Sequence, residues 1–491
     1  MSIRRTNYKR CNMNKLITSE HAENLPTVRI KKAILKDFKN VGYGEIIFNC
    51  GRQFVPYNTE ADILGIYGQN GSGKTSFIEA LSILQDLMAG AAVSGAYADC
   101  VAIGKKFSEL EFIFDLQYKN GIIREATYSF CLSRKKLSED EIHEKYKDAP
   151  DDFEIPDEDY KVVVFNERFS LIWENASKRQ VIIDTSSKES PFIPTTKRKE
   201  IAGSGKKTLV SLEVNKQLAY EKSRSFIFMM ETLQLFAEND NKTLFFQVLV
   251  ELRLFARNYL FVVDTKSSGF IRLNFALPIY TGNGQFMFDV RRPVTIDNIH
   301  LDDLRADIGK ISSVLTQLVP GLSIRFKEIS QTLNKDGEAA TIVMLTAYRE
   351  GKEIPLRDES DGIRKIISVL SLIIAAFNER SVTVAIDEFD AGIFEYLLGE
   401  ILQSMEESGK GQFIFTSHNL RPLEVINKKF LYFTTTNPQN RYIRLKKVAT
   451  TNNLRDTYFR EIILCEQDEE IYKKTKKFKI VAALKKAGGL R

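Results

Sequence analysis

The sequence is poor in cysteine and histidine, and this scarcity excludes several kinds of site. It has five cysteines among 491 residues, and no two of them form a C-x-x-C pair. Neither a disulfide framework nor a zinc hook is therefore expected. Its four histidines are His21, His143, His300 and His418, and no two of them are close in sequence. A histidine-based metal nuclease centre is therefore hard to assemble from this chain.

Long apolar runs are also missing. The longest run, residues 369–377, is interrupted by Ser371 and is far shorter than the ~20 residues that cross a bilayer. The basic N-terminal stretch has no apolar core after it, unlike a secretory signal. We therefore expect a cytoplasmic protein with no membrane partner. The formal net charge of +6 permits contact with nucleic acid but does not require it.

One short glycine-rich segment is typical of phosphate binding. Residues 65–76, GIYGQNGSGKTS, contain the pattern G-x-x-x-x-G-K-[ST] between a strand-like apolar run and a stretch of helical period. Successive backbone N–H groups in such a loop hold a β-phosphate, and the dipole of the following helix assists them. Lys74 would reach the β- and γ-phosphate oxygens. The predicted nucleotide contacts in this loop are Gly68, Gln69, Asn70, Gly71, Ser72, Gly73, Lys74, Thr75 and Ser76. The alternative is a plain tight turn.

Two later strand-like runs end in side chains suited to catalysis. SVTVAIDEFD places Asp387 and Glu388 at a strand end, and GQFIFTSHN ends at His418. We predict that Thr75 and Asp387 bind Mg²⁺ and that Glu388 activates the attacking water as a general base. His418 would contact the γ-phosphate, so the predicted catalytic residues are Glu388, His418 and Lys74. The alternatives are an ordinary acidic loop and a surface histidine.

The segment RDESDGIRKIISVLSLIIAAFNER predicts an apolar helix that begins near Ser360. Ser360 or Asp361 would cap this helix, and Gly362 would permit close backbone approach, so its positive end could face an anion. We therefore predict that Ser360 and Gly362 contact nucleotide as well. The alternative is a simple helix cap.

In this order the motifs resemble those of the ABC-type ATPases of the SMC and OLD-like group. The stretch RIKKAILKDFKN is similar to the opening strand of that group, with Asp37 where the group often has asparagine. The resemblance covers residues 28–132 and 290–435. It implies ATP hydrolysis with Mg²⁺ and a homodimer or higher homo-oligomer in which ATP is sandwiched between heads, the start of the signature helix facing the partner's nucleotide. The Q-loop segment, residues 162–175, lacks the glutamine, and Asn166 or Glu167 is the candidate metal-side contact in its place.

The expected fold class is α/β: an ABC/SMC-type P-loop ATPase head with a mixed sheet, an antiparallel lobe and a short helical insertion. The expected parts are an N-terminal extension (1–25), the first part of the head with the Walker A loop (26–204), a helical or short coiled-coil insertion (205–290), the second part with the signature, Walker B and switch histidine (291–450), and a basic helical tail (451–491). The insertion is too short for a long coiled-coil arm. Its apolar stretches FIFMM and LFFQVLVELRLF are expected to pack against another subunit or an effector.

Two classes of function remain open. The resemblance to the PARIS-type and Septu-type ATPase subunits implies a sensor and scaffold of anti-phage defence. Residues 419–491 are too few for the fused Toprim domain of OLD-type nucleases, so the effector, a Toprim or HNH nuclease, is expected on another chain, with DNA or a phage protein as the trigger. The alternative is a repair or replication ATPase that binds DNA directly. A transporter subunit conflicts with the long separation of Lys74 from Asp387 and with the short S-D-G signature.

Overall fold

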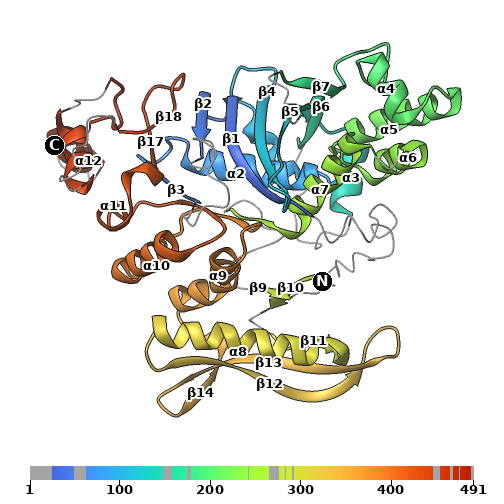
Figure 1. Cartoon of the computed structure of the whole chain (residues 1–491). Coiled ribbons are helices and arrows are strands. Elements are labelled where there is room, and N and C mark those ends of the chain that lie inside the picture. The colour runs from blue at the N-terminus through green and yellow to red at the C-terminus, as the bar shows by residue number, and fades with distance from the viewer. Residues whose placement is uncertain are drawn as a thin grey trace.

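The computed structural model describes residues 25–48, 62–147, 158–173, 178–240, 243–264, 276–281, 284–289, 292–445, 454–464, 468–474 and 476–487. Within these ranges the chain forms two six-stranded sheets, a smaller sheet with a long helix, and flanking helices (Figure 1). This combination of a mixed sheet and an antiparallel sheet with helices confirms the expected α/β fold class. No helix in the described ranges is long and apolar enough to cross a bilayer.

The central sheet has the strand order β18-β17-β3-β16-β15-β8, and only β18 runs antiparallel to its neighbour. Its parallel strands are buried along their whole length, which explains why they read as continuous apolar runs. Because parallel strands end at one edge, the residues that follow β3, β15 and β16 are brought together. The strands are β3 (Asp62–Tyr67), β8 (Leu260–Val263), β15 (Thr383–Ile386), β16 (Gln412–Thr416), β17 (Leu431–Thr434) and β18 (Tyr442–Ile443).

The second large sheet is antiparallel throughout, in the order β2-β1-β4-β5-β6-β7. The alternating runs around Lys39-Asn40 and around Asn120-Gly121 predict two hairpins, and both form, since Phe38 pairs with Val41 and Gln117 pairs with Ile123. The strands are β1 (Thr27–Phe38), β2 (Val41–Ile47), β4 (Ser108–Gln117), β5 (Ile123–Lys136), β6 (Tyr160–Ile172) and β7 (Gln180–Asp184). One apolar core joins this sheet, helices α2 (Lys74–Ala89) and α7 (Leu244–Asn258), and one face of the central sheet.

A third sheet lies at the bottom of Figure 1 beside helix α8 (Leu301–Leu318). Its strands are β11 (Val294–Asp297), β12 (Leu322–Leu333), β13 (Ala339–Arg349) and β14 (Lys352–Pro355). The other three strands each pair antiparallel with β13. A separate hairpin pairs β9 (Ala276–Thr281) with β10 (Gly284–Asp289). Helices α9 (Asp361–Asn378) and α10 (Glu395–Ser408) share the second apolar core, which reaches from α8 to the other face of the central sheet.

The interpretation of residues 205–290 needs correction. Helices α5 (Lys206–Glu221), α6 (Met230–Asp240) and α7 confirm the helical period, but β8 follows α7 directly and pairs with β15 in the central sheet. The apolar stretches are not free surface, because Phe228 is fully buried and Phe246 is 1% exposed in the chain's own core. The expectation that they pack against another subunit was therefore wrong. Propensity and period show that a helix is apolar, not which neighbour covers it.

The remaining helices are short and peripheral. They are α3 (Glu139–Tyr146), α4 (Thr195–Ala202), α11 (Pro422–Val425), α12 (Leu454–Leu464) and α13 (Lys477–Ala487), with 3-10 turns at Gly95–Cys100, Asn298–His300, Leu356–Asp358 and Lys428–Phe430. Helices α12 and α13 lie within residues 451–491, for which the sequence predicts a basic helical tail. Residues 1–24, assigned to an N-terminal extension, lie outside the described residues.

Candidate phosphate-binding site

The phosphate loop connects β3 to α2, as its motif predicts. Gly68, Gly71 and Gly73 all have positive φ, at 154°, 73° and 101°, a region that side chains with a Cβ rarely adopt. A Cβ on Gly68 would lie 1.7 Å from Oγ1 of Thr434, so the loop is seated on the end of β17. No side chain caps the start of α2 at Gly73. The N–H groups at this helix end are therefore open to an anion.

Lys74 folds back over its own loop. Its Nζ donates hydrogen bonds to the carbonyl oxygens of Gly68 at 2.8 Å and Gln69 at 3.1 Å. Burial lowers the pKa of Lys74 to about 8, against the opposing attraction of Asp387, Glu388 and Asp390. No described carboxylate forms an ion pair with this ammonium, and phosphate oxygens would supply the missing negative charge.

Asp387 has one carboxylate oxygen bound and one unused. Thr416 donates its hydroxyl to Oδ1 of Asp387 at 2.5 Å, and the same Oγ1 accepts from the Glu388 N–H at 2.8 Å. Oδ2 of Asp387 is buried and has no hydrogen-bond partner among the described residues. A buried unpaired carboxylate oxygen is costly unless a cation or a donor meets it. With the Thr75 hydroxyl on the cavity wall, the donor set fits Mg²⁺, which keeps water and substrate oxygens as its other ligands.

Glu388 projects into the cavity from a left-handed backbone position. Its φ is 48°, which is uncommon for a residue with a Cβ and is a form of strain found at functional sites. Lys365 of α9 donates its Nζ to the Glu388 carbonyl oxygen at 2.5 Å. Burial lowers the pKa of Lys365, although Asp390, Glu388 and Asp387 oppose this. The signature helix thereby holds the strained turn that carries the predicted base.

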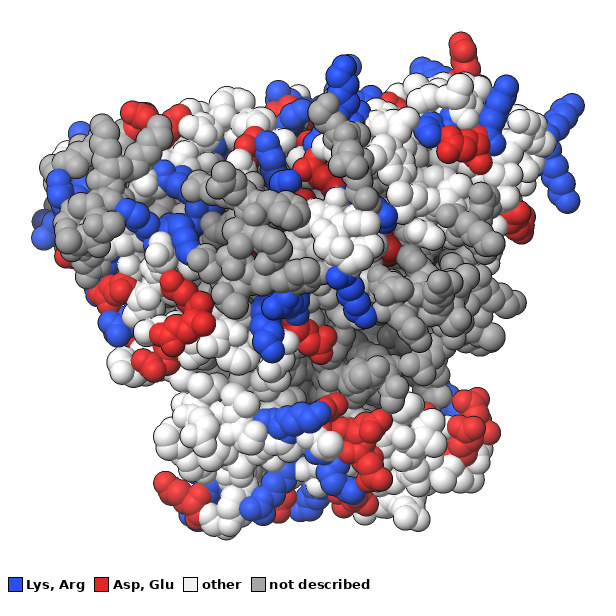
Figure 2. Space-filling model, in the orientation of Figure 1, with Lys and Arg blue, Asp and Glu red and all other residues white. Residues whose placement is uncertain are grey.

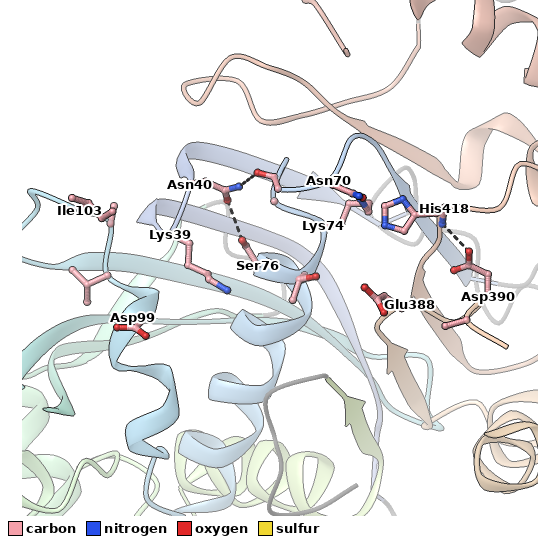
Figure 3. Close-up of a pocket in the computed structure, with 16 residues that line it drawn as sticks. Lys39, Asn40, Asn70, Lys74, Ser76, Asp99, Ile103, Glu388, Asp390 and His418 are labelled. Atoms are coloured by element: carbon pink, nitrogen blue, oxygen red, sulfur yellow. Dashed lines mark hydrogen bonds between the residues drawn. The ribbon is translucent and has the colours of Figure 1, made fainter. Parts of the chain in front are cut away.

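His418 lies beside Lys74, on the side of Lys74 away from Asn40 (Figure 3). Its backbone N–H donates to Oδ2 of Asp390 at 3.0 Å, and the Asn419 N–H donates to the same oxygen at 2.9 Å. Partial burial, and next the Lys74 charge, lower the pKa of the His418 imidazole. The ring is therefore neutral at pH 7, with one nitrogen able to donate and the other to accept.

These side chains line one cavity of about 1110 Å³. From the sequence prediction it brings together Asn70, Gly71, Gly73, Lys74, Thr75, Ser76, Glu388 and His418. The cavity is not lined by four other predicted residues, Gly68, Gln69, Ser72 and Asp387. The Oγ of Ser72 lies 2.5 Å from Oγ1 of Thr434. No cluster of three or more histidine, cysteine or acidic ligands for a metal occurs in the described ranges. A bound divalent ion would therefore depend on Thr75, Asp387 and phosphate oxygens.

Ser360 and Gly362 are placed elsewhere. Ser360 is exposed and caps α9, its Oγ accepting from the Ile363 N–H at 3.4 Å. A Cβ on Gly362 would lie 2.3 Å from the Gly392 carbonyl oxygen. The close backbone approach predicted for Gly362 is thus made within the chain, to the turn that follows Glu388. Neither residue lines the cavity of its own phosphate loop.

The proposed substitutes for the Q-loop glutamine were wrong. Glu167 does not line this cavity but is buried elsewhere, where its carboxylate accepts hydrogen bonds from Tyr128 at 2.7 Å, Ser225 at 2.5 Å and the Phe226 N–H at 2.7 Å. Asn166 lines a second cavity together with Glu167. The order of motifs along the chain does not determine whether residues of an antiparallel strand reach the phosphate-binding cavity.

Several site residues were missed. Asn40 donates its side-chain amide to the Gly71 carbonyl oxygen and accepts from the Ser76 hydroxyl at 3.1 Å (Figure 3). Lys39 lies 2.5 Å from the buried carboxylate of Glu79 on α2. The only sequence signal for these two residues was their place in a hairpin turn. Asp390 could have been suspected, because it continues the acidic run that begins at Asp387.

Comparison with known proteins agrees with this geometry. A family model described as "AAA domain, putative AbiEii toxin, Type IV TA system" matches residues 63–241 and 282–424. No curated protein matches the chain significantly.

Three solved structures show a distant likeness. The Smc head bound to the C-winged helix domain of ScpA has a TM-score of 0.38 at 14% identity, covering 85% of this chain and 98% of that one. The SMC head domain from Thermotoga maritima gives 0.34 at 14% identity, with 85% and 99% covered. The recombination mediator protein RecF with ATP gives 0.31 at 10% identity, with 80% and 94% covered. The matched family includes the phosphate loop, α9 and the strands that end at Asp387 and His418. The chain therefore belongs to this family of AAA-domain proteins.

Proposed function

We propose that this protein is a Mg²⁺-dependent ATPase whose heads pair around ATP and control a separately encoded effector in anti-phage defence. One observation carries the catalytic part. Lys74 and Thr75 on one wall face Glu388 and His418 on the other across a single cavity. A phosphate-binding loop opposite a carboxylate base and a neutral imidazole has the parts that phosphoryl transfer to water requires.

Each wall has its own task. The loop N–H groups and Lys74 would bind the β- and γ-phosphates, and Thr75 with Oδ2 of Asp387 would hold Mg²⁺, which supplies charge neutralisation when bound. Glu388 would accept a proton from the attacking water, and its carbonyl bond to Lys365 fixes the turn that aims it. His418 would donate to the γ-phosphate from a position fixed by Asp390.

The far end of the cavity suits the base of the nucleotide. Val101, Ala102 and Ile103 line it together with Asp99, and Ile103, which lies away from Lys74 (Figure 3), is fully exposed. An apolar wall with few polar groups is the usual surface for a flat ring. The phosphate loop lies at the other end, so one nucleotide spans the cavity.

A site shared between two subunits is supported by the position of the α9 helix start, which does not line the cavity of its own chain. Ser360 caps α9 at an exposed helix start, outside its own cavity. The first-turn N–H groups of α9 would bind the γ-phosphate held by a second copy, as the motif order implies. ATP would thus join two heads, and both cavities would be completed by the dimer.

The defence role is supported by the order of motifs and by the absence of a long coiled-coil arm in the described ranges. The alternative, a repair or replication head that binds DNA directly, shares every residue of the cavity. A neighbouring gene for a Toprim or HNH nuclease whose product co-purifies with this chain would support defence. Co-purification with repair proteins and retention of DNA by the head would support the alternative.

Glu388→Gln tests the ATPase proposal. We expect a loss of ATP turnover of roughly 10²–10⁴-fold, since that is the usual contribution of a positioned base, with ATP binding retained and a dimer accumulating. Phosphate release and light-scattering mass would be measured with ATP and Mg²⁺. The matched control is Glu238→Gln, an exposed carboxylate on α6 and outside the cavity. Normal turnover in Glu388→Gln would show that Glu388 is not the base.

A further inference from the structure

The C-terminal segment is fastened beside the phosphate loop. The Glu469 carboxylate accepts hydrogen bonds from the side chains of Asn437 at 3.1 Å and Asn440 at 3.0 Å, and Ile471 is 2% exposed in the second core. The backbone N–H of Lys473 then donates to Oε1 of Gln69, within the phosphate loop, at 3.1 Å. The chain that follows Lys473 therefore leaves the molecule from the rim of the nucleotide site.

Helix α13, which follows this fastening, has no buried residue. It exposes an apolar set of Phe478 (67%), Ile480 (48%), Val481 (42%) and Leu484 (69%). Residues 473–486 also contain seven lysines and no acidic residue, and without these seven lysines the formal net charge of +6 would be −1. The net positive charge of the chain thus depends on α13, which holds four of these lysines, and on the short segment before it, which holds the other three. Such a helix matches an acidic surface that also offers apolar side chains.

The chain itself carries a surface of that chemistry. Residues 381–409 contain seven acidic residues and no lysine or arginine. Helix α10 exposes Glu395, Glu400 and Glu407 from this stretch. Phe394 at its start is 72% exposed and Tyr396 is 56% exposed. Large exposed aromatic side chains next to carboxylates complement the lysines and apolar residues of α13.

The two surfaces would meet between subunits. The start of α10 lies next to the start of α9, because Gly362 of α9 and Gly392, two residues before Phe394, touch through their backbones. In the proposed dimer, on which this inference rests, the start of α9 faces the partner's phosphate loop. The partner's α13 leaves from the rim of that same loop. We propose that α13 of each subunit docks on the acidic face of α10 of the second copy and stabilises the ATP-bound pair.

Charge reversal tests this docking in the Glu388→Gln parent with ATP and Mg²⁺. The tail variant is Lys477→Glu with Lys479→Glu, in the first turn of α13, where acidic residues suit the helix dipole and leave the helix folded. The helix variant is Glu400→Lys with Glu407→Lys on α10. Each alone places like charges opposite each other, and we expect the dimer dissociation constant to rise by roughly tenfold or more. Lys206→Glu with Lys207→Glu on α5, also exposed, is the matched control and should change nothing.

Mixing the two variants gives the decisive measurement. In a heterodimer of tail variant and helix variant, one contact pairs reversed charges and the other is the native contact, so both are attractive. We expect sedimentation velocity to show the heterodimer with the parent's affinity, while each variant alone stays largely monomeric. Recovery in the mixture would support direct docking, because a variant that merely unfolds cannot be rescued in this way.

Other outcomes would overturn the proposal. Unchanged dimer affinity in both charge-reversed variants would show that α13 does not dock on α10. Loss of binding to a 30-base-pair duplex DNA in the tail variant, with an unchanged dimer, would assign the lysines to nucleic acid instead. If the Glu388→Gln parent hydrolyses ATP slowly but stays monomeric, the shared site fails, and the docking proposal fails with it. If the parent dimerises and both charge-reversed variants dimerise with the same affinity, the shared site stands and the docking proposal alone fails.

Discussion

At the scale of single residues, the site combines charges that are costly until a ligand arrives. Within the described part of the chain, Lys74 is a buried ammonium bound only to backbone carbonyls, and Asp387 has a buried oxygen without a partner. Glu388 adds a strained backbone position. A site arranged in this way has little to reorganise on binding Mg²⁺ and phosphate, because its charges are already placed.

The lowered pKa of Lys74 predicts a pH dependence of ATP binding. Only the ammonium form pairs with phosphate, and bound phosphate raises its pKa again. Affinity should thus be constant below pH 7 and fall as pH rises through about 8, because the neutral amine must first take up a proton. The limiting slope is about tenfold in the dissociation constant per pH unit.

Calorimetry from pH 6.5 to 9.5 in two buffers of different ionisation enthalpy would measure both affinity and proton uptake. Lys74→Arg is the control, because a guanidinium stays charged over this range, and its curve should be flat. A wild-type curve as flat as that of Lys74→Arg would contradict the prediction.

Removal of the charge gives a second residue-scale prediction. Lys74→Ala should lower ATP affinity by roughly 10²-fold or more, since hydrogen bonds to charged groups contribute about 1.5–3 kcal/mol each. The fold should persist, because within the described residues the hydrogen bonds of Lys74 go only to its own loop. Calorimetry and thermal unfolding measure the two effects separately. Undiminished ATP binding would contradict the assignment.

At the scale of elements, the signature helix and the turn after Glu388 act as one unit. The backbones of Gly362 and Gly392 touch, and Lys365 reaches the Glu388 carbonyl oxygen. A movement of α9 therefore moves the predicted base. Bulk at Gly362 would therefore disturb its own chain before it met a partner.

Gly362→Ala measures that contact. Its Cβ would lie 2.3 Å from the Gly392 carbonyl oxygen, so we expect a destabilisation of about 1–3 kcal/mol from overpacking and lower ATP turnover. Gly309→Ala on α8 is the matched control, because nothing lies within 4 Å of its Cβ, and alanine should stabilise that helix by about 1 kcal/mol. Denaturant unfolding reports both. If Gly362→Ala stabilised the protein as much as Gly309→Ala, the backbone around Gly392 would move aside at little cost in free energy.

At the scale of the whole molecule, the proposed shared site makes activity a property of the pair. Lys74→Ala removes the loop side of a site, and Ser360→Arg places bulk at an exposed helix start without entering its own cavity. Each variant alone should be inactive. A heterodimer of the two would contain one site with neither change, so an equal mixture should recover roughly a quarter of wild-type turnover, as half of its dimers hold one of two sites.

Phosphate release by the mixture checks this prediction at several total concentrations. The matched mixture is Lys74→Ala with Glu388→Gln, in which Lys74 and Glu388 serve the same cavity and every heterodimer site still carries one change or the other. We therefore expect no recovery of turnover from the mixture of Lys74→Ala with Glu388→Gln. Failure of the Ser360→Arg mixture to recover any turnover would count against a shared site.

The sequence alone determined the motifs and their local structures. The strand, glycine loop and helix around Lys74, the two hairpins and the helical tail follow from short-range period and turn chemistry, which depend on neighbouring residues only. The strand ends at Asp387 and His418 followed in the same way. These signals sufficed for the fold class and for half of the residues that line the cavity.

Only the tertiary structure decided which surfaces are covered and which distant groups meet. Phe228 and Phe246 are buried by their own chain, Asn40 reaches the phosphate loop from a hairpin, and Gly362 packs on Gly392. Glu167 belongs to a separate buried network. Each of these contacts joins residues far apart in sequence, and their proximity depends on how sheets and helices stack. Local periodicity carries no information about that stacking, because an apolar face has the same pattern whichever neighbour buries it.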